Sequence, residues 1–194
     1  MERIRGFIAL ELPPAVRETL GSLEQRLKMG QHSFVKWVDP NSIHITLKFL
    51  GSVPASAVPD IAKVIDGLPK LAAPLSFQVQ ELGVFPNWKR PQVVWVGIGG
   101  DTSRLAGIQR ELENSLAPLG FPPEARAFRP HLTLGRVRER ARAAERQALG
   151  SWLASVSVEP GPPFQVNGLS LMKSQLTPTG PLYTRLAFAG FQST

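Results

Sequence analysis

The stretch His44-Ile45-Thr46-Leu47 occurs a second time, in nearly the same form, as His131-Leu132-Thr133-Leu134. Both stretches follow the pattern H-x-T-L, and together they contain two of the three histidines in the chain. Random placement of the histidines and threonines would give the His-x-Thr spacing only about 0.1 times. Acid–base chemistry needs two such groups, because one imidazole can accept a proton while the other donates one. The doubled motif therefore predicts a candidate active site as well as an organisation of the fold.

Each motif is typical of a half-buried β-strand. Side chains at positions i and i+2 of a strand point to the same face. His44 and Thr46 are therefore expected to project together, and so are His131 and Thr133. The apolar residues that alternate with them are expected to face the core. Each strand would then present an imidazole and a hydroxyl on its polar face.

The two motifs lie 87 positions apart, and other segments match at the same offset. Residues 77–79 (FQV) recur at 164–166, and the apolar segment 7–10 (FIAL) falls on 94–97 (VWVG). Self-similarity at a fixed offset indicates an internal repeat. We therefore expect residues 1–194 to form a single bilobal domain that arose by duplication.

The expected secondary structure follows the same order in both copies, which span about residues 3–90 and 91–190. Period-2 or short apolar segments predict strands, and apolar residues at helical spacing predict helices. Strands are expected at 4–11, 43–50, 75–84, 93–98, 131–137, 164–172 and 182–188, and helices at 13–29, 55–68, 102–116 and 141–153. This order predicts an α+β fold with antiparallel sheets covered by helices on one face and related by a pseudo-twofold axis.

The composition favours a polyanionic partner. The chain has 194 residues with a net charge of +7, and arginine supplies 15 of its 22 cations, seven of them within residues 126–146. A guanidinium can bind two phosphate oxygens at once, so this bias suits phosphate. A solvated basic surface is the alternative explanation.

Several other classes of protein are disfavoured. Cysteine is absent, which excludes a disulfide framework and a thiolate nucleophile or metal ligand. Glu11 interrupts the apolar run near the N-terminus, so neither a signal peptide nor a membrane span is expected. We expect a cytoplasmic monomer with no membrane partner.

A phosphate fits between the two motifs if the repeat axis brings their polar faces together. The threonine hydroxyls can donate to non-bridging oxygens, while one histidine flanks the attacking oxygen and the other flanks the leaving oxygen. An imidazole with a pKa of ~6.5 exists in both protonation states near neutral pH. Neither motif contains a carboxylate, and a catalytic zinc usually has three protein ligands. No metal or other cofactor is therefore expected.

The motifs resemble those of the 2H phosphoesterase superfamily, and more narrowly those of the RNA 2′,3′-cyclic phosphodiesterases, also called 2′-5′ RNA ligases. The resemblance covers residues 44–51 (HITLKFLG) and 129–136 (RPHLTLGR). It extends to the opening residues 5–13 (RGFIALELP) and the closing residues 174–183 (SQLTPTGPLY). It therefore spans essentially the whole chain.

The resemblance implies a bilobal fold with a central cleft and hydrolysis of a nucleoside 2′,3′-cyclic phosphate to a 2′-phosphomonoester. It also implies roles for four residues. His44 would donate a proton to the departing 3′ oxygen, and His131 would activate water. Thr46 and Thr133 would hold the phosphate oxygens. The resemblance also implies a secondary 2′-5′ RNA ligation, in which a 5′-hydroxyl is the reacting group.

Further residues are possible substrate contacts. Strand alternation places Lys48 on the face of His44 and Phe49 in the core, and it places Arg136 opposite His131 unless the strand is bulged. Arg126 and Arg129 lie just upstream of the second motif and could meet the substrate backbone. A nucleobase could stack on Trp37, Phe85 or Trp88, which lie in loop-like sequence, although each could equally pack at the edge of a lobe.

Two alternative functions remain open on the sequence. One is a phosphodiesterase of the same superfamily that acts on a small cyclic or 2′-5′-linked nucleotide. The other is an RNA-binding module in which the motifs are not catalytic. An RNA-binding module would show no turnover, which distinguishes it from an enzyme. A preference for mononucleotide over oligonucleotide substrates would distinguish the small-nucleotide phosphodiesterase from an enzyme that acts on RNA ends.

Overall fold

Nine strands form one continuous antiparallel sheet in the computed structural model, which describes residues 2–68, 74–178 and 180–192. The strands are β1 (Arg3–Glu11), β2 (Val35–Trp37), β3 (His44–Pro54), β4 (Leu75–Phe85), β5 (Val93–Gly100), β6 (His131–Val137), β7 (Phe164–Val166), β8 (Gly168–Leu176) and β9 (Pro181–Gly190). The helices are α1 (Pro14–Lys28), α2 (Val58–Gly67), α3 (Thr102–Leu116) and α4 (Ala143–Ser155). The predicted α+β class with antiparallel strands is confirmed.

The sheet consists of two four-stranded halves joined at their edges. One half has the order β7-β4-β5-β6 and the other the order β3-β1-β8-β9, while β2 pairs with β6. Strands β3 and β6 pair through one residue pair of the described chain, Ile45 with Leu132. Each half takes strands from both expected copies, because β4 pairs with β5 and β8 pairs with β1. The two copies are therefore intertwined rather than stacked as separate lobes.

The pairing between β1 and β3 is repeated between β5 and β6, including its irregularity. His44, Thr46 and Lys48 pair with Glu11, Ala9 and Ile8. Their counterparts 87 positions later, His131, Thr133 and Gly135, pair with Gly97, Trp95 and Val94. In both ladders the leucine that ends the motif, Leu47 or Leu134, has no cross-strand partner and forms a β-bulge.

This repeated register supports the proposed internal duplication and corrects one detail of it. Residues 7–10 were expected to match 94–97. Their cross-strand partners instead match 7–10 with 93–96, an offset of 86 positions in place of 87. Because the bulge is the same in both copies, the difference lies in the connection, which is one residue longer from Gly97 to His131 than from Glu11 to His44.

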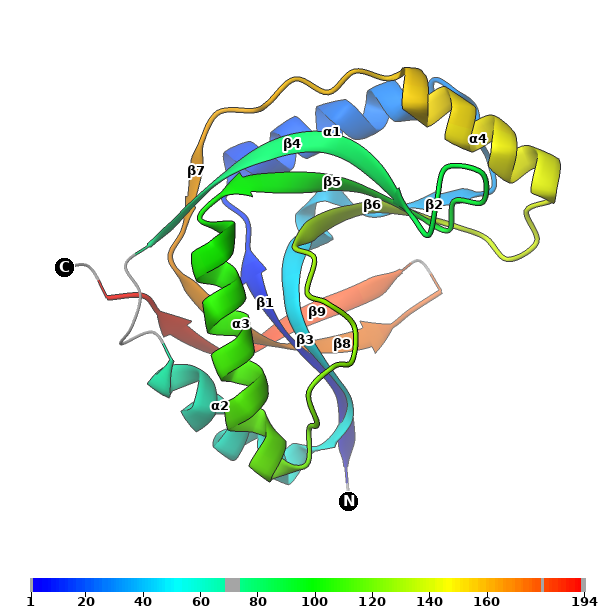
Figure 1. Cartoon of the computed structure of the whole chain (residues 1–194). Coiled ribbons are helices and arrows are strands. Elements are labelled where there is room, and N and C mark those ends of the chain that lie inside the picture. The colour runs from blue at the N-terminus through cyan, green and yellow to red at the C-terminus, as the bar shows by residue number, and fades with distance from the viewer. Residues whose placement is uncertain (1, 69–73, 179, 193–194) are drawn as a thin grey trace.

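The helices are exchanged between the two halves (Figure 1). Helix α1 follows β1 in the chain but lies with α4 along the half formed by β4, β5 and β6. The indole Nε1 of Trp152 in α4 donates to the carbonyl of Leu27 in α1. Helix α3 follows β5 but packs against α2 and β3 of the other half. One continuous cluster of buried apolar side chains runs under both halves.

Most predicted elements are present, with four differences. The predicted strand 164–172 is split into β7 and β8, and β3 continues past Gly51 to Pro54. The predicted helix 55–68 begins with a 3-10 turn at Ala55–Ala57 before α2. Strand β2 was not predicted, because three residues are too few for a period-2 pattern.

Lys48 lies on the core side of the sheet, so its predicted place on the face of His44 is wrong. The bulge at Leu47 reverses the alternation, and the Lys48 side chain is only 3% exposed. Its Nζ lies 2.5 Å from Oε2 of Glu113 in α3 and donates to the carbonyl oxygen of Pro122 at 2.6 Å. Phe49 correspondingly turns outward and is 57% exposed, although alternation predicted it in the core.

Replacement of Lys48 by Met is expected to destabilise the protein strongly. It would leave the Glu113 carboxylate buried without its cation, which typically costs about 3–5 kcal/mol. Urea unfolding at neutral pH measures the change. The double variant Lys48→Met with Glu113→Leu is expected to recover most of the loss, because it removes both charges. Lys63→Met is the matched control, since the Lys63–Asp60 pair is exposed and such pairs contribute roughly 0–1 kcal/mol. Equal destabilisation in Lys48→Met and Lys63→Met would contradict this account.

Candidate active site

The two H-x-T motifs meet where the two halves of the sheet join. Ile45 and Leu132 form the β3–β6 pair and are both fully buried. Because the strands are antiparallel, the neighbours on either side bring His44 beside Thr133 and Thr46 beside His131. These four side chains project from the face opposite the two buried residues, and all four are half-buried. The structure therefore brings the four predicted residues into one pseudo-twofold set.

Both imidazoles are held by the same hydrogen bond. Nδ1 of His44 lies 2.8 Å from the carbonyl oxygen of Ser42, and Nδ1 of His131 lies 2.7 Å from that of Arg129. A carbonyl oxygen only accepts, so Nδ1 carries a proton and donates it in each ring. The proton that each ring can gain or lose near neutral pH is therefore at Nε2.

Aromatic rings surround each imidazole. Phe7 from β1 stacks on His44 with ring centroids 4.7 Å apart, and Tyr183 from β9 meets the same imidazole edge-on at 5.3 Å. Phe85 at the end of β4 lies edge-on to His131 at 5.1 Å, and Trp95 from β5 lies 6.0 Å away. These rings exclude water from one side of each histidine and limit the orientations that the imidazoles can adopt.

The environment lowers the pKa of both histidines. Burial is the main cause for His44, whose pKa is also lowered by Arg136 and His131 and raised by the Ser42 carbonyl and by Glu11. Burial is likewise the main cause for His131, with a smaller lowering by Arg136 and a raising by the Arg129 carbonyl. The neutral form of each imidazole is therefore favoured until an anion binds between them.

Arg136 lies on the face of the two histidines. The bulge at Leu134 reverses the alternation, so Arg136 is exposed while Gly135 is buried. Its positive charge lowers the pKa of His44, His131 and Tyr183, which places it within electrostatic reach of all three. Strict alternation assigned it to the opposite face. The register of the repeat shows why this fails, because Arg136 is the counterpart of Phe49, which turns outward for the same reason.

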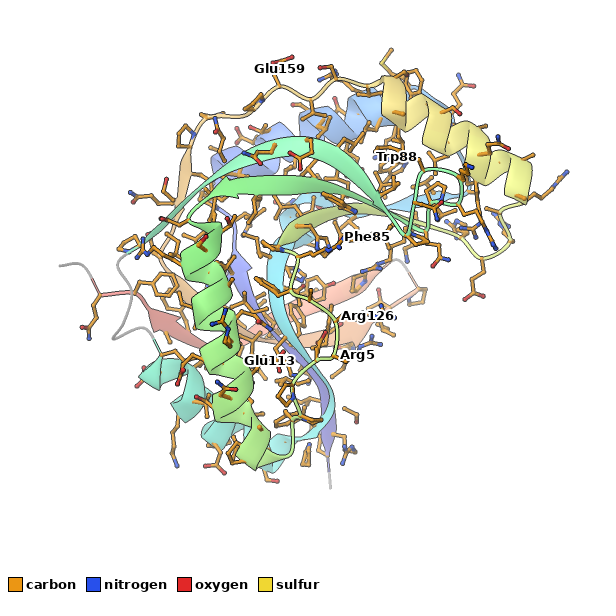
Figure 2. The ribbon with its side chains drawn as sticks, viewed as in Figure 1. Arg5, Phe85, Trp88, Glu113, Arg126 and Glu159 are labelled. Atoms are coloured by element: carbon orange, nitrogen blue, oxygen red, sulfur yellow. The ribbon has the colours of Figure 1, made fainter. Side chains whose placement is uncertain are left out.

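The other predicted substrate contacts are placed differently. Trp37 lies in β2, pairs with Gly135 and packs against the core, so it is neither in a loop nor on the histidine face. Arg126 and Arg129 are exposed on the connection between α3 and β6, where Figure 2 labels Arg126. Arg129 contributes its carbonyl to His131 in addition to an exposed guanidinium. Trp88 is 41% exposed in the loop after β4.

Sequence reasoning missed four residues that surround the histidines. Phe7, Glu11 and Tyr183 reach His44 from β1 and β9, and Trp95 reaches His131 from β5. The alternation of β1 was the available signal, because Phe7 and Glu11 share a face.

Within the described ranges, no cluster of three or more His, Asp or Glu side chains is placed to hold a metal ion. The described helices also include none that is long and apolar enough to cross a membrane.

Comparison with known proteins shows which family the chain resembles. The family described as LigT like Phosphoesterase matches the chain twice, over residues 10–95 and 98–183. The RNA 2′,3′-cyclic phosphodiesterase of Methanothermobacter thermautotrophicus is 33% identical over 183 residues, which is 94% of this chain and 96% of that protein.

Solved structures share the fold over nearly their whole length. TT0787 of Thermus thermophilus has a TM-score of 0.78 at 28% identity and covers 97% of this chain and 98% of its own. E. coli LigT complexed with 3′-AMP has a TM-score of 0.69 at 24% identity and covers 99% of this chain and 100% of its own. The family matches both copies of the repeat, and the relatives and solved structures match nearly the whole chain. The chain therefore belongs to the LigT-like phosphoesterase family of the 2H superfamily.

Proposed function

We propose that this protein hydrolyses RNA 2′,3′-cyclic phosphate ends to 2′-phosphomonoesters by general acid–base catalysis with two histidines and no metal ion. The observation that carries the proposal is the matched pair of imidazoles. Each is anchored at Nδ1 by a carbonyl two residues upstream, so both make Nε2 available for proton transfer. The relatives named RNA 2′,3′-cyclic phosphodiesterase support the substrate class, since they match nearly the full length of this chain.

The reaction needs one proton removed and one supplied. Nε2 of His131 takes a proton from a water molecule as the water oxygen attacks phosphorus. The bond between phosphorus and the 3′ oxygen breaks, and Nε2–H of His44 gives its proton to that oxygen. The phosphorus keeps its bond to the 2′ oxygen, so the product is a 2′-phosphomonoester. Each positioned proton transfer typically contributes about 10²–10⁴-fold to the rate.

Groups around the Ile45–Leu132 pair of β3 and β6 balance the negative charge of the phosphate. Thr46 and Thr133 stand beside opposite histidines and can donate their hydroxyl protons to the non-bridging oxygens. Arg136 lies in electrostatic reach of both imidazoles and opposes the negative charge that builds on those oxygens during attack. Binding of the dianionic transition state would also raise the pKa of His44 and favour its protonated, donating form.

The exposed arginines favour an RNA end over a free mononucleotide. Arg126 and Arg129 lie on the connection that leads into His131, beyond the phosphate site itself. Additional guanidinium groups can neutralise further backbone phosphates. With a 5′-hydroxyl in place of water, the same displacement would form a 2′-5′ linkage, which we regard as secondary.

Replacement of either catalytic histidine by Ala is expected to lower kcat/KM by at least about 100-fold, because each removes one proton transfer. The assay uses an RNA oligonucleotide with a 2′,3′-cyclic phosphate end in the presence of EDTA, and resolves the cyclic and opened ends. His32→Ala is the matched control, because His32 lies outside the site beside Phe34. Opening of the end at the wild-type rate in His44→Ala or His131→Ala, or loss of wild-type activity in EDTA, would contradict the proposal.

Replacement of Arg136 by Met is expected to raise the pKa of both histidines, because its charge lowers both in the wild type. The pH dependence of kcat/KM should be bell-shaped. Its acidic limb, where His131 becomes protonated, should move to higher pH in the variant, and the maximum should fall. Arg138→Met provides the control, since Arg138 is exposed on the same segment. An unchanged acidic limb in Arg136→Met would show that this charge does not act on the base.

A further inference from the structure

Glu11 is the cross-strand partner of His44. It ends β1, where the register pairs it with His44 at the start of β3. Its Oε1 accepts a hydrogen bond from the hydroxyl of Ser170 and lies 3.1 Å from Nε of Arg185. Ser170 is fully buried, and the Glu11 side chain is 29% exposed. The carboxylate is therefore held in place beside the imidazole from two further strands, β8 and β9.

The second half of the site has no counterpart of this held carboxylate. The partner of His131 is Gly97, at the position equivalent to Glu11. Glu81 of β4 lies against Gly97, with its Oε1 3.1 Å from the position that a Cβ there would take, but it is exposed, and among the described residues no serine or arginine holds it. Ser170 pairs with Ala9, and the equivalent pair in the other half is Gly83 with Trp95. Both groups of the hydrogen bond are thus replaced by glycine next to His131. The duplicated ladders agree in register and bulge but differ at these two positions.

The charges that face the two histidines differ accordingly. His44 is faced by Glu11 from β1, by Arg136 and His131 from β6, and by Tyr183 from β9. Glu11 raises the pKa of His44, whereas Arg136 and His131 lower it. Arg136 also lowers the pKa of His131, and among the described groups that shift this pKa there is no carboxylate. The two histidines of the near-symmetric pair therefore lie in different electrostatic environments.

We propose that Glu11, held by Ser170 and Arg185, is a positioning residue that keeps His44 in its proton-donating form and so decides which imidazole is the acid. A general acid must carry its proton when the leaving oxygen departs, and burial of His44 works against this. A fixed carboxylate in the neighbouring strand offsets that burial without contact with the substrate. His131, which faces glycine, is left as the base. The assignment of acid and base rests on the proposed function, whereas the effect of Glu11 on His44 does not.

The first test measures the histidines directly. The ring signals of His32, His44 and His131 are followed by NMR over a pH titration, with assignment from the single His→Ala variants. In Glu11→Gln, the pKa of His44 should fall while those of His131 and His32 stay in place. Glu111→Gln, at an exposed position of α3, is the control and should move none of them. An unmoved His44, or an equal fall in both active-site histidines, would overturn the proposal.

A second variant separates charge from local structure. Glu11→Asp keeps the negative charge but shortens the side chain, so the pKa of His44 should lie between those of the wild type and Glu11→Gln. Identical titration of His44 in Glu11→Asp and Glu11→Gln would mean that the carboxylate charge is not the cause. This variant also keeps the test available if Glu11→Gln fails to fold, because its comparison with the wild type then decides the outcome.

The kinetic readout tests the assignment of the acid. In Glu11→Gln the alkaline limb of the kcat/KM profile on the cyclic RNA end should move to lower pH, while the acidic limb stays unchanged. Movement of the acidic limb instead would mean that His44 has the lower pKa of the two histidines, which would overturn the proposal that Glu11 keeps it in the proton-donating form. Failure of the wild-type protein to open the cyclic end would refute the proposed function alone, because the NMR titration tests the effect of Glu11 independently.

Discussion

One antiparallel backbone pair, Ile45 with Leu132, joins the two halves of the sheet and places the two motifs against each other. Two edge strands that meet at a single pair diverge on either side of it, and this leaves the flanking histidines and threonines half-buried rather than sealed in a sheet. Ile45 and Leu132 are fully buried, so the apolar core holds the junction from behind. The face that carries the two histidines therefore depends on a contact that is stabilised by burial on the opposite face.

Packing of the exchanged helices stabilises this junction. Helices α1 and α3 each cross to the half that their preceding strand does not belong to. The buried pair between Lys48 and Glu113 ties β3 to α3, on which Figure 2 labels Glu113. The hydrogen bond from Lys48 to the carbonyl of Pro122 holds the start of the connection that leads to His131. Separation of the two halves would expose the apolar core that they share. The two motifs can thus keep a constant relation although they lie 87 positions apart.

The differences between the copies give a near-symmetric site its direction. Lys48 corresponds to Gly135, Phe49 to Arg136 and Glu11 to Gly97. At each of these positions one copy carries a charge and the other does not. A symmetric pair of histidines would have no preferred acid, because both imidazoles would feel the same field. The cation at Arg136 and the anion at Glu11 remove that equivalence by acting on the pair from different strands.

The sequence alone determined the features that depend on local periodicity. The motif residues, their shared face within each strand, the α+β order and most helices and strands follow from period-2 and helical spacing. The sequence could not determine the bulges, because a bulge is a property of how two strands pair, and this is why Lys48, Phe49 and Arg136 were assigned to the wrong faces. The surroundings of the histidines were likewise decided only by the tertiary structure. Phe7, Glu11, Trp95 and Tyr183 come from strands far from the motifs in sequence, and the folded sheet alone brings them within reach of the imidazoles.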